Sequence, residues 1–152
     1  MKVAVGSDHA GYPLKEAVVR FLERQDVDLK DFGAYSTDSV DYPDIGLAVA
    51  EAVANGDFDL GVLVCGTGIG MSMTANKVPG IRAALCKDTC CAAMAREHND
   101  ANILVLGGRV TEEETAFDIV RTFLATDFPG EERHAKRIRK ITEVERKYSK
   151  GG

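Results

Sequence analysis

Short apolar runs alternate with amphipathic segments along the whole chain, and this alternation restricts the possible folds more than any other feature of the sequence. Helical periodicity, turn signals and helix-start signals separate the runs, so we predict six helices between and after the strands. One of these helices should be opened by a capping box of Thr111 and Glu114, and the last and most basic one should span 131–148. Parallel strands joined by helical crossovers are covered on both faces, which predicts a three-layer α/β/α Rossmann-like fold with a five-stranded parallel sheet. The predicted strands are 2–7, 27–33, 60–65, 81–86 and 102–107.

Length and composition limit the classes of protein to which the chain can belong. With 152 residues, 45% of them hydrophobic, it can form a single domain over 1–152 with a substantial core. It contains no apolar run of about 20 residues and no signal-peptide pattern, and its four cysteines lack a disulfide spacing, so we expect a cytoplasmic protein with no membrane partner. A net charge of −5 argues against nucleic acid as a partner.

The stretch LGVLVCGTGIG, residues 60–70, places a thiol at the start of a glycine-rich loop. The loop follows the third strand and lacks a dinucleotide or P-loop signature. Its main-chain N–H groups can instead form a nest that binds an oxyanion, although the glycines can also serve a tight strand-to-helix turn. In this position Cys65 can act as a nucleophile or a general base, and the alternative is a small core residue. We interpret the other three cysteines as packing residues and expect no metal site.

Ligands of parallel α/β sheets bind at the carboxyl ends of the strands, and several polar residues are predicted there. Asp8 and His9 follow the first strand, and Arg109 follows the fifth. His98 and Asn99 fall at the opposite edge of the sheet, from which they can reach a site on a neighbouring subunit.

The C-terminal segment is the most basic part of the chain, since residues 131–150 hold eight Lys or Arg and four Asp or Glu. Arg133 and Arg137 share a helix face at i, i+4 and suit a phosphate group, although a solvated basic face is the ordinary role of such residues. The segment also has an apolar stripe, which indicates that it packs on something, and a partner is one option.

Taken together, these residues resemble the type B ribose-5-phosphate isomerases of the ribose/galactose phosphate isomerase group. The resemblance covers essentially the whole chain. It rests on GSDHAG (6–11), DYPD (41–44), CGTGIGMSMTANKVPGIRAAL (65–85), EHNDANILVLGGR (97–109) and ERHAKRIRKI (132–141).

The resemblance implies an aldose–ketose isomerase that works through an enediolate, without metal or cofactor. Cys65 would be the base, and Thr67 and His98 would assist opening of the sugar ring. The family site lies at a dimer interface, so the basic C-terminal helix would pack at a subunit interface. The implied substrate-binding residues are Asp8 and Asn99 for hydroxyls, Tyr42 for the pocket wall, Gly66, Gly68, Ile69 and Gly70 for the enediolate oxygen, and His9, Arg133, Arg137 and, less directly, Arg109 for the phosphate.

Some relatives carry serine at position 65 and a glutamate base at position 71. Met71 cannot titrate, so this chain falls on the cysteine branch. All the implied groups occur in one chain, which predicts a homodimer or homotetramer. The expected reaction interconverts D-ribose 5-phosphate and D-ribulose 5-phosphate in the pentose phosphate pathway. The alternatives are a six-carbon substrate such as allose or galactose 6-phosphate, and a non-catalytic module that binds phosphate ligands.

Overall fold

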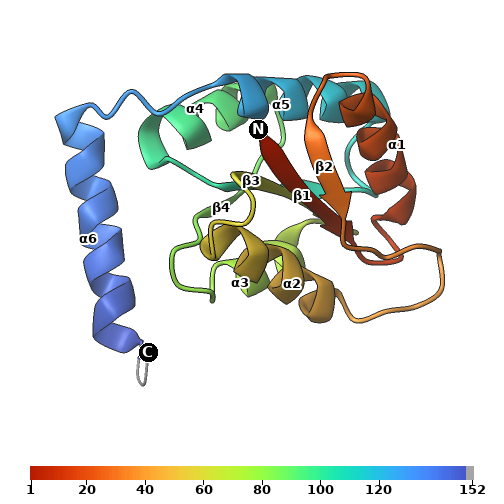
Figure 1. Cartoon of the computed structure of the whole chain (residues 1–152), viewed down its shortest axis with the longest axis horizontal. Helices are drawn as coiled ribbons and strands as arrows, with labels where there is room; N and C mark the ends of the chain where they lie inside the picture. The colour runs from red at the N-terminus through yellow and green to blue at the C-terminus, as the bar shows by residue number, and fades with distance from the viewer. Residues whose placement is uncertain (150–152) are drawn as a thin grey trace.

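The computed structural model describes residues 1–149 and has the predicted five-stranded parallel sheet with six helices. The strand order is β2-β1-β3-β5-β4, so the order of connection reverses between β1 and β3 (Figure 1). The strands are β1 (Lys2–Ser7), β2 (Asp28–Asp31), β3 (Leu60–Cys65), β4 (Ala83–Leu85) and β5 (Ile103–Gly107). The helices are α1 (Tyr12–Glu23), α2 (Tyr42–Ala54), α3 (Ile69–Ala75), α4 (Thr89–Asn99), α5 (Glu113–Ala125) and α6 (Glu132–Tyr148).

The two edge strands are shorter than the sequence pattern predicts. β2 pairs only with β1, and β4 pairs only with β5. Before β4 begins, the N–H of Arg82 donates to the side chain of Asn102 at 2.8 Å instead of continuing a ladder. An edge strand has a partner on one side only, so side-chain hydrogen bonds of this kind can end it early.

The predicted capping box is wrong. Helix α5 begins at Glu113 with Glu112 as its N-cap residue, and no side chain caps its first turn. Thr111 therefore lies one position too early to cap. The turn after β5, in which the N–H of Val110 donates to the carbonyl of Gly107 at 3.2 Å, delays the start of the helix.

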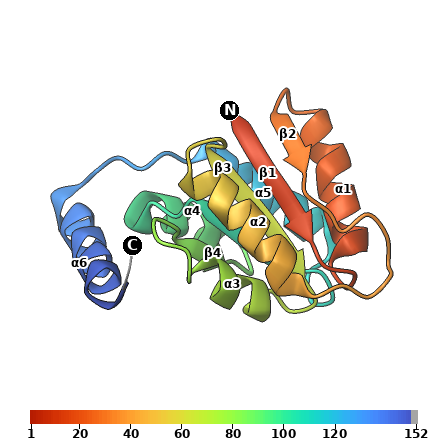
Figure 2. The ribbon, with the colours of Figure 1, turned by 60° about the horizontal axis from the view of Figure 1, so that its bottom comes forward.

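Side chains alternate between two apolar clusters, one on each face of the sheet. Val62 and Val64 of β3 face the cluster that α1, α4 and α5 cover. Leu63 and Cys65 face the cluster that α2 and α3 cover (Figure 2). Because successive strand residues point to opposite faces, this alternation decides that the Cys65 side chain lies on the α2–α3 side.

Helix α6 stands apart from the sheet at one end of the molecule, beyond the irregular segment 126–131 (Figures 1 and 2). It contacts α4, and Glu145 accepts a hydrogen bond from the N–H of Gly80 at 3.0 Å. Ile141, Val144 and Tyr148 on this helix are 51%, 60% and 71% exposed, so its apolar stripe is largely uncovered. Over residues 1–149, none of the helices combines the length and the apolar composition that crossing a membrane requires.

Candidate functional site

The loop after β3 brings main-chain N–H groups toward the Cys65 thiol. The N–H of Gly68 donates to Cys65 Sγ at 3.2 Å, and the N–H of Ile69 donates to Thr67 Oγ1 at 3.3 Å. Gly68 has a φ of +83°, and a Cβ there would lie 3.2 Å from the main-chain carbonyl of Leu106. Only glycine meets both conditions without strain, so this glycine is required to aim an amide at the sulfur.

Cys65 itself is 5% exposed and packs on the α2–α3 side of the sheet with Met71 and Val105. Cys65 is therefore buried like a core residue, as one of the two interpretations of this cysteine expected. Its sulfur nevertheless has a polar neighbour, since the Gly68 amide points to it. Met71 is fully buried, and its thioether has no proton to exchange, so it cannot serve as the base at position 71.

Asp8 and His9 lie beside this loop, at the carboxyl end of β1. Asp8 is buried, its N–H donates to the carbonyl of Val64 at 3.2 Å, and its Oδ1 accepts from the N–H of Gly11 at 2.8 Å. His9 is half-buried, and its Nδ1 accepts from the N–H of Val40 at 3.2 Å. Both side chains are thus held by main-chain groups next to the end of β3.

Arg109 and Tyr42 border the loop from two other elements. A Cβ on Gly66 would lie 3.4 Å from Arg109 Nη1, and a Cβ on Gly70 would lie 2.5 Å from the Tyr42 ring. The N–H of Arg109 also donates to the carbonyl of Gly66 at 2.9 Å. The structure therefore gathers one group of predicted residues, which we call the carboxyl-edge cluster: Asp8, His9, Tyr42, Cys65, Gly66, Thr67, Gly68, Ile69, Gly70 and Arg109.

The remaining predicted residues form a second group, the outer cluster, which consists of His98 and Asn99 at the end of α4 and Arg133 and Arg137 on α6. Helix α4 returns from the carboxyl end of β4 to the amino end of β5. Its last residues therefore lie at the end of the sheet where the strands begin, opposite to Cys65. Within one chain the structure does not bring the two clusters together (Figures 1 and 2).

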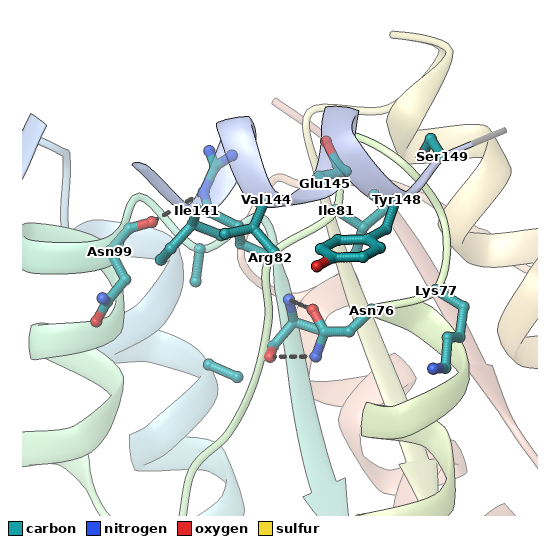
Figure 3. A pocket seen from close by; sticks show the side chains of 13 residues that line it. Asn76, Lys77, Ile81, Arg82, Asn99, Ile141, Val144, Glu145, Tyr148 and Ser149 are labelled. Carbon is teal, nitrogen blue, oxygen red and sulfur yellow. Dashed lines mark hydrogen bonds between the residues drawn. The ribbon is translucent and has the colours of Figure 1, made fainter. Parts of the chain in front are cut away.

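Arginine side chains hold the end of α4 in place. Arg82 Nε donates to the carbonyl of Asn99 at 2.9 Å (Figure 3), and its Nη2 donates to the carbonyl of Asp100 at 2.8 Å. Arg96 adds bonds to Asp100 Oδ1 at 3.1 Å and to the carbonyl of Ala101 at 2.5 Å. These bonds satisfy carbonyls that a helix end leaves free, so they define where His98 and Asn99 lie.

A hollow of about 830 Å³ opens beside the outer cluster, between α6 and the β4 edge. Apolar side chains line much of it: Ile81, which lies just before β4, and Ile141, Val144 and Tyr148 from α6 (Figure 3). Asn99 also borders this hollow, whereas Cys65 does not.

His134 belongs beside the outer cluster, although we did not predict it as a site residue. It is buried, and its ring stacks on that of His98 with centroids 4.1 Å apart and an interplanar angle of 13°. Burial, followed by the positive charges of His98, Arg133 and Arg137, lowers the pKa of His134, and Glu131 opposes this shift. Its position between two candidate phosphate-binding arginines was the available sequence signal.

Comparisons with known proteins agree on one family. Residues 3–141 match the family described as Ribose/Galactose Isomerase. The chain is 47% identical over 148 residues to the "Putative sugar phosphate isomerase YwlF" of Bacillus subtilis, covering 97% of this chain and 99% of that protein. It is 42% identical over 146 residues to ribose-5-phosphate isomerase B of Escherichia coli, covering 96% and 97%. The solved structure of Clostridium thermocellum ribose-5-phosphate isomerase B superposes with a TM-score of 0.96 at 55% identity, covering 98% and 100%.

Proposed function

Since the chain belongs to the ribose/galactose isomerase family and is thereby an aldose–ketose isomerase, we propose that it interconverts D-ribose 5-phosphate and D-ribulose 5-phosphate. The names of the Escherichia coli and Clostridium thermocellum relatives support the five-carbon sugar phosphate. The observation that carries the proposed chemistry is the Cys65 thiol with the Gly68 amide 3.2 Å from its sulfur.

In the proposed mechanism the Cys65 thiolate removes the proton from C2 of the open-chain aldose. The C–H electron pair forms the C1–C2 double bond, and the carbonyl electrons move to O1, which becomes the enediolate oxygen. Amides of Gly66, Gly68 and Gly70 would donate to this oxygen, because preorganised donors stabilise charge where it develops. The Cys65 thiol then returns the proton to C1, and the proton of the C2 hydroxyl moves to O1, giving the ketose without a cofactor.

The sugar must first open from its ring form, and we assign this step to Thr67 and His98 as a general acid–base pair. Asp8 and Asn99 would hold hydroxyl groups, Tyr42 would line the pocket, and Ile69 would offer its amide. Residues of both clusters are needed, and one chain keeps the clusters apart. We therefore assign the outer cluster of each site to a second copy of the chain, in a homodimer or a pair of such dimers.

The phosphate would be bound by His9 and Arg109 from one copy and by Arg133 and Arg137 from the other. Arg133 and Arg137 are exposed and lie one turn apart on α6, which suits bidentate contact with phosphate oxygens. Arg133 Nε also lies 3.3 Å from Glu131 Oε2. This ion pair is exposed, so a phosphate can displace the Glu131 carboxylate from Arg133.

The test is isomerisation of ribose 5-phosphate and allose 6-phosphate by the wild type and by Cys65→Ala. We expect higher kcat/KM with ribose 5-phosphate, and a loss of roughly 10²- to 10⁴-fold in kcat for Cys65→Ala, the usual contribution of a positioned acid–base group. Cys86→Ala is the matched control: Cys86 is also buried, and burial raises its pKa to about 12, so its thiol stays protonated.

A Cys65→Ala enzyme that keeps more than about a tenth of the wild-type activity would refute the cysteine base, given the usual size of such contributions. A preference for allose 6-phosphate would replace the proposed substrate with a six-carbon sugar phosphate. Ligand binding without turnover of either sugar would support a non-catalytic binding module.

A further inference from the structure

Lys15 on α1 is a charged side chain with no solvent exposure. Lysines are almost never fully buried unless they are paired. All three N–H donors of this ammonium are used, at 2.7 Å to Asp31 Oδ2, 2.7 Å to the carbonyl of Ala34 and 3.0 Å to Glu16 Oε1. Two tyrosine rings also lie near it, with centroids 5.0 Å and 5.6 Å from Nζ.

Two of these three bonds hold the turn that follows β2. Asp31 Oδ1 accepts from the N–H of Gly33 at 2.9 Å, and the Tyr35 hydroxyl donates to the Asp31 carbonyl at 3.0 Å. This turn also holds Ser7 through two main-chain hydrogen bonds. Ser7 donates its N–H to the Gly33 carbonyl, and Ala34 donates its N–H to the Ser7 carbonyl, both at 2.6 Å. Lys15 is thus connected to the residue that precedes Asp8 and His9.

The same segment continues into the carboxyl-edge cluster. Its residue Val40 donates its N–H to His9 Nδ1 at 3.2 Å, and the segment ends at Tyr42, whose ring lies against Gly70. An imidazole whose Nδ1 accepts a hydrogen bond carries its proton on Nε2 when neutral. The position of the Val40 amide therefore decides which nitrogen of His9 can donate.

We propose that Lys15 is a positioning residue of the active site. By anchoring Asp31 and Ala34, it places the 31–42 segment so that Val40 holds His9 in the Nε2–H tautomer. This inference rests on the proposed function in one respect, namely that His9 Nε2 donates to the substrate phosphate.

The chemistry of a buried charge supports this role over a purely stabilising one. Well-packed apolar residues often stabilise a core as well as a buried ion pair does, because the ions lose their hydration. An ammonium, however, directs three hydrogen bonds at defined atoms, and here one of them reaches a main-chain carbonyl. An apolar side chain of the same volume cannot restrain that carbonyl.

The test compares Lys15→Met with Leu22→Ala, which removes a buried apolar side chain from the same helix. The primary readout is the ¹⁵N spectrum of the histidine rings of the ligand-free enzyme, with the His9 signals assigned by their loss in His9→Asn. The chain has only three histidines, so these signals can be resolved. The secondary readout is KM against kcat for ribose 5-phosphate.

For the wild type and Leu22→Ala we expect the Nε2–H tautomer of His9 and an unchanged KM. For Lys15→Met we expect a mixture of tautomers and a rise in KM of roughly 10- to 100-fold, the value of a hydrogen bond to a charged group, with a smaller change in kcat. Should Lys15→Met fail to fold, Asp31→Asn removes the pairing charge with little change of shape and should shift the tautomer in the same direction.

An unchanged His9 tautomer in the folded variant would overturn the proposal, as would an equal KM rise in Leu22→Ala. A shifted tautomer with an unchanged KM would support the positioning of His9 by Lys15 and would refute the contact between His9 and phosphate. The spectrum needs no substrate, so the two failures can be told apart.

Discussion

The carboxyl-edge cluster and the outer cluster are built in different ways. In the first, main-chain groups place the functional atoms: the Gly68 amide meets Cys65 Sγ, and the Val40 amide meets His9 Nδ1. In the second, the candidate phosphate-binding groups Arg133 and Arg137 are long, exposed side chains on α6, and Arg133 is 68% exposed. Proton transfer needs atoms that are placed as precisely as main-chain groups place them. Binding of a phosphate can use exposed, mobile side chains, which a partner then holds in position.

Under the proposed function, neither cluster is a complete site by itself, because the structure keeps the two apart. The carboxyl-edge cluster contains the proposed base and amide donors, while His98 and the paired arginines lie at the other sheet edge. A second copy of the chain can supply the missing half to each site, because a two-fold axis presents the same surfaces reciprocally.

The largest expected effect is restored activity when two inactive variants are mixed. Cys65→Ala and His98→Asn should each be nearly inactive as homodimers. After joint unfolding and refolding in equal amounts, the mixture should recover about a quarter of the wild-type activity, because half of the dimers are mixed and each contains one intact site.

The control for this experiment mixes Cys65→Ala with Thr67→Ala, whose altered residues lie in the same cluster of one chain. In a mixed dimer of these two variants each site keeps one defect, so no recovery is expected. Equal recovery in both mixtures, or none in either, would contradict a site that is shared between copies.

A smaller effect is expected from arginine substitutions on α6. Arg137→Ala should raise KM for ribose 5-phosphate by roughly 10- to 100-fold, because it removes a charged hydrogen bond to phosphate. Arg139→Ala removes an equal charge from the same helix, but Arg139 pairs with Glu132. Steady-state kinetics of the two variants should therefore differ, and equal KM values would show that only the overall charge of α6 matters.

The smallest expected effect is a change in the pH dependence of stability through His134. Its pKa is lowered in the folded state, so the unfolded chain binds more protons between the folded value and about 6.5, the unfolded value. The contribution of His134 to the free energy of unfolding should be fully present above about pH 6.5. It should be lost as the pH falls toward and through the pKa of His134 in the folded state. The melting temperature of the ligand-free enzyme between about pH 5 and 7.5 measures this.

His134→Phe keeps a ring that can stack on His98 but removes the titrating group. Its melting temperature should fall less than that of the wild type as the pH is lowered. An identical pH dependence in the two proteins would show that the His98–His134 stack does not couple protonation to folding.

Much of the fold could be predicted because the signals are local. Apolar runs and amphipathic periods predicted the five parallel strands and six helices. The errors occur where tertiary neighbours compete with local preference: the Arg82 amide bonds to Asn102 rather than to a strand, and α5 starts after Thr111. A capping box is recognised from residue spacing alone, and that spacing does not show at which residue the helix begins. Here the turn after β5 makes the helix begin after Thr111.

The candidate site divides in the same manner. Cys65 and its glycines could be identified because they are contiguous, and their φ requirement is visible in residue type. His134 was not predicted as a site residue because neighbouring arginines also occur on a solvated basic face, and its burial and its stack with His98 arise only in the folded chain. Lys15 was missed because nothing near it in sequence indicates that its ammonium reaches Asp31 and Ala34.

The sequence by itself determined the sheet, the glycine loop and the chemical types of the groups at the strand ends, since each depends on residues close together along the chain. Only the tertiary structure decided which of those groups meet. It placed Val40 against His9, Arg109 against Gly66, and His98 at the end of the sheet opposite to Cys65. Contacts of this kind depend on how distant segments pack, and packing is a property of the whole chain rather than of any short stretch.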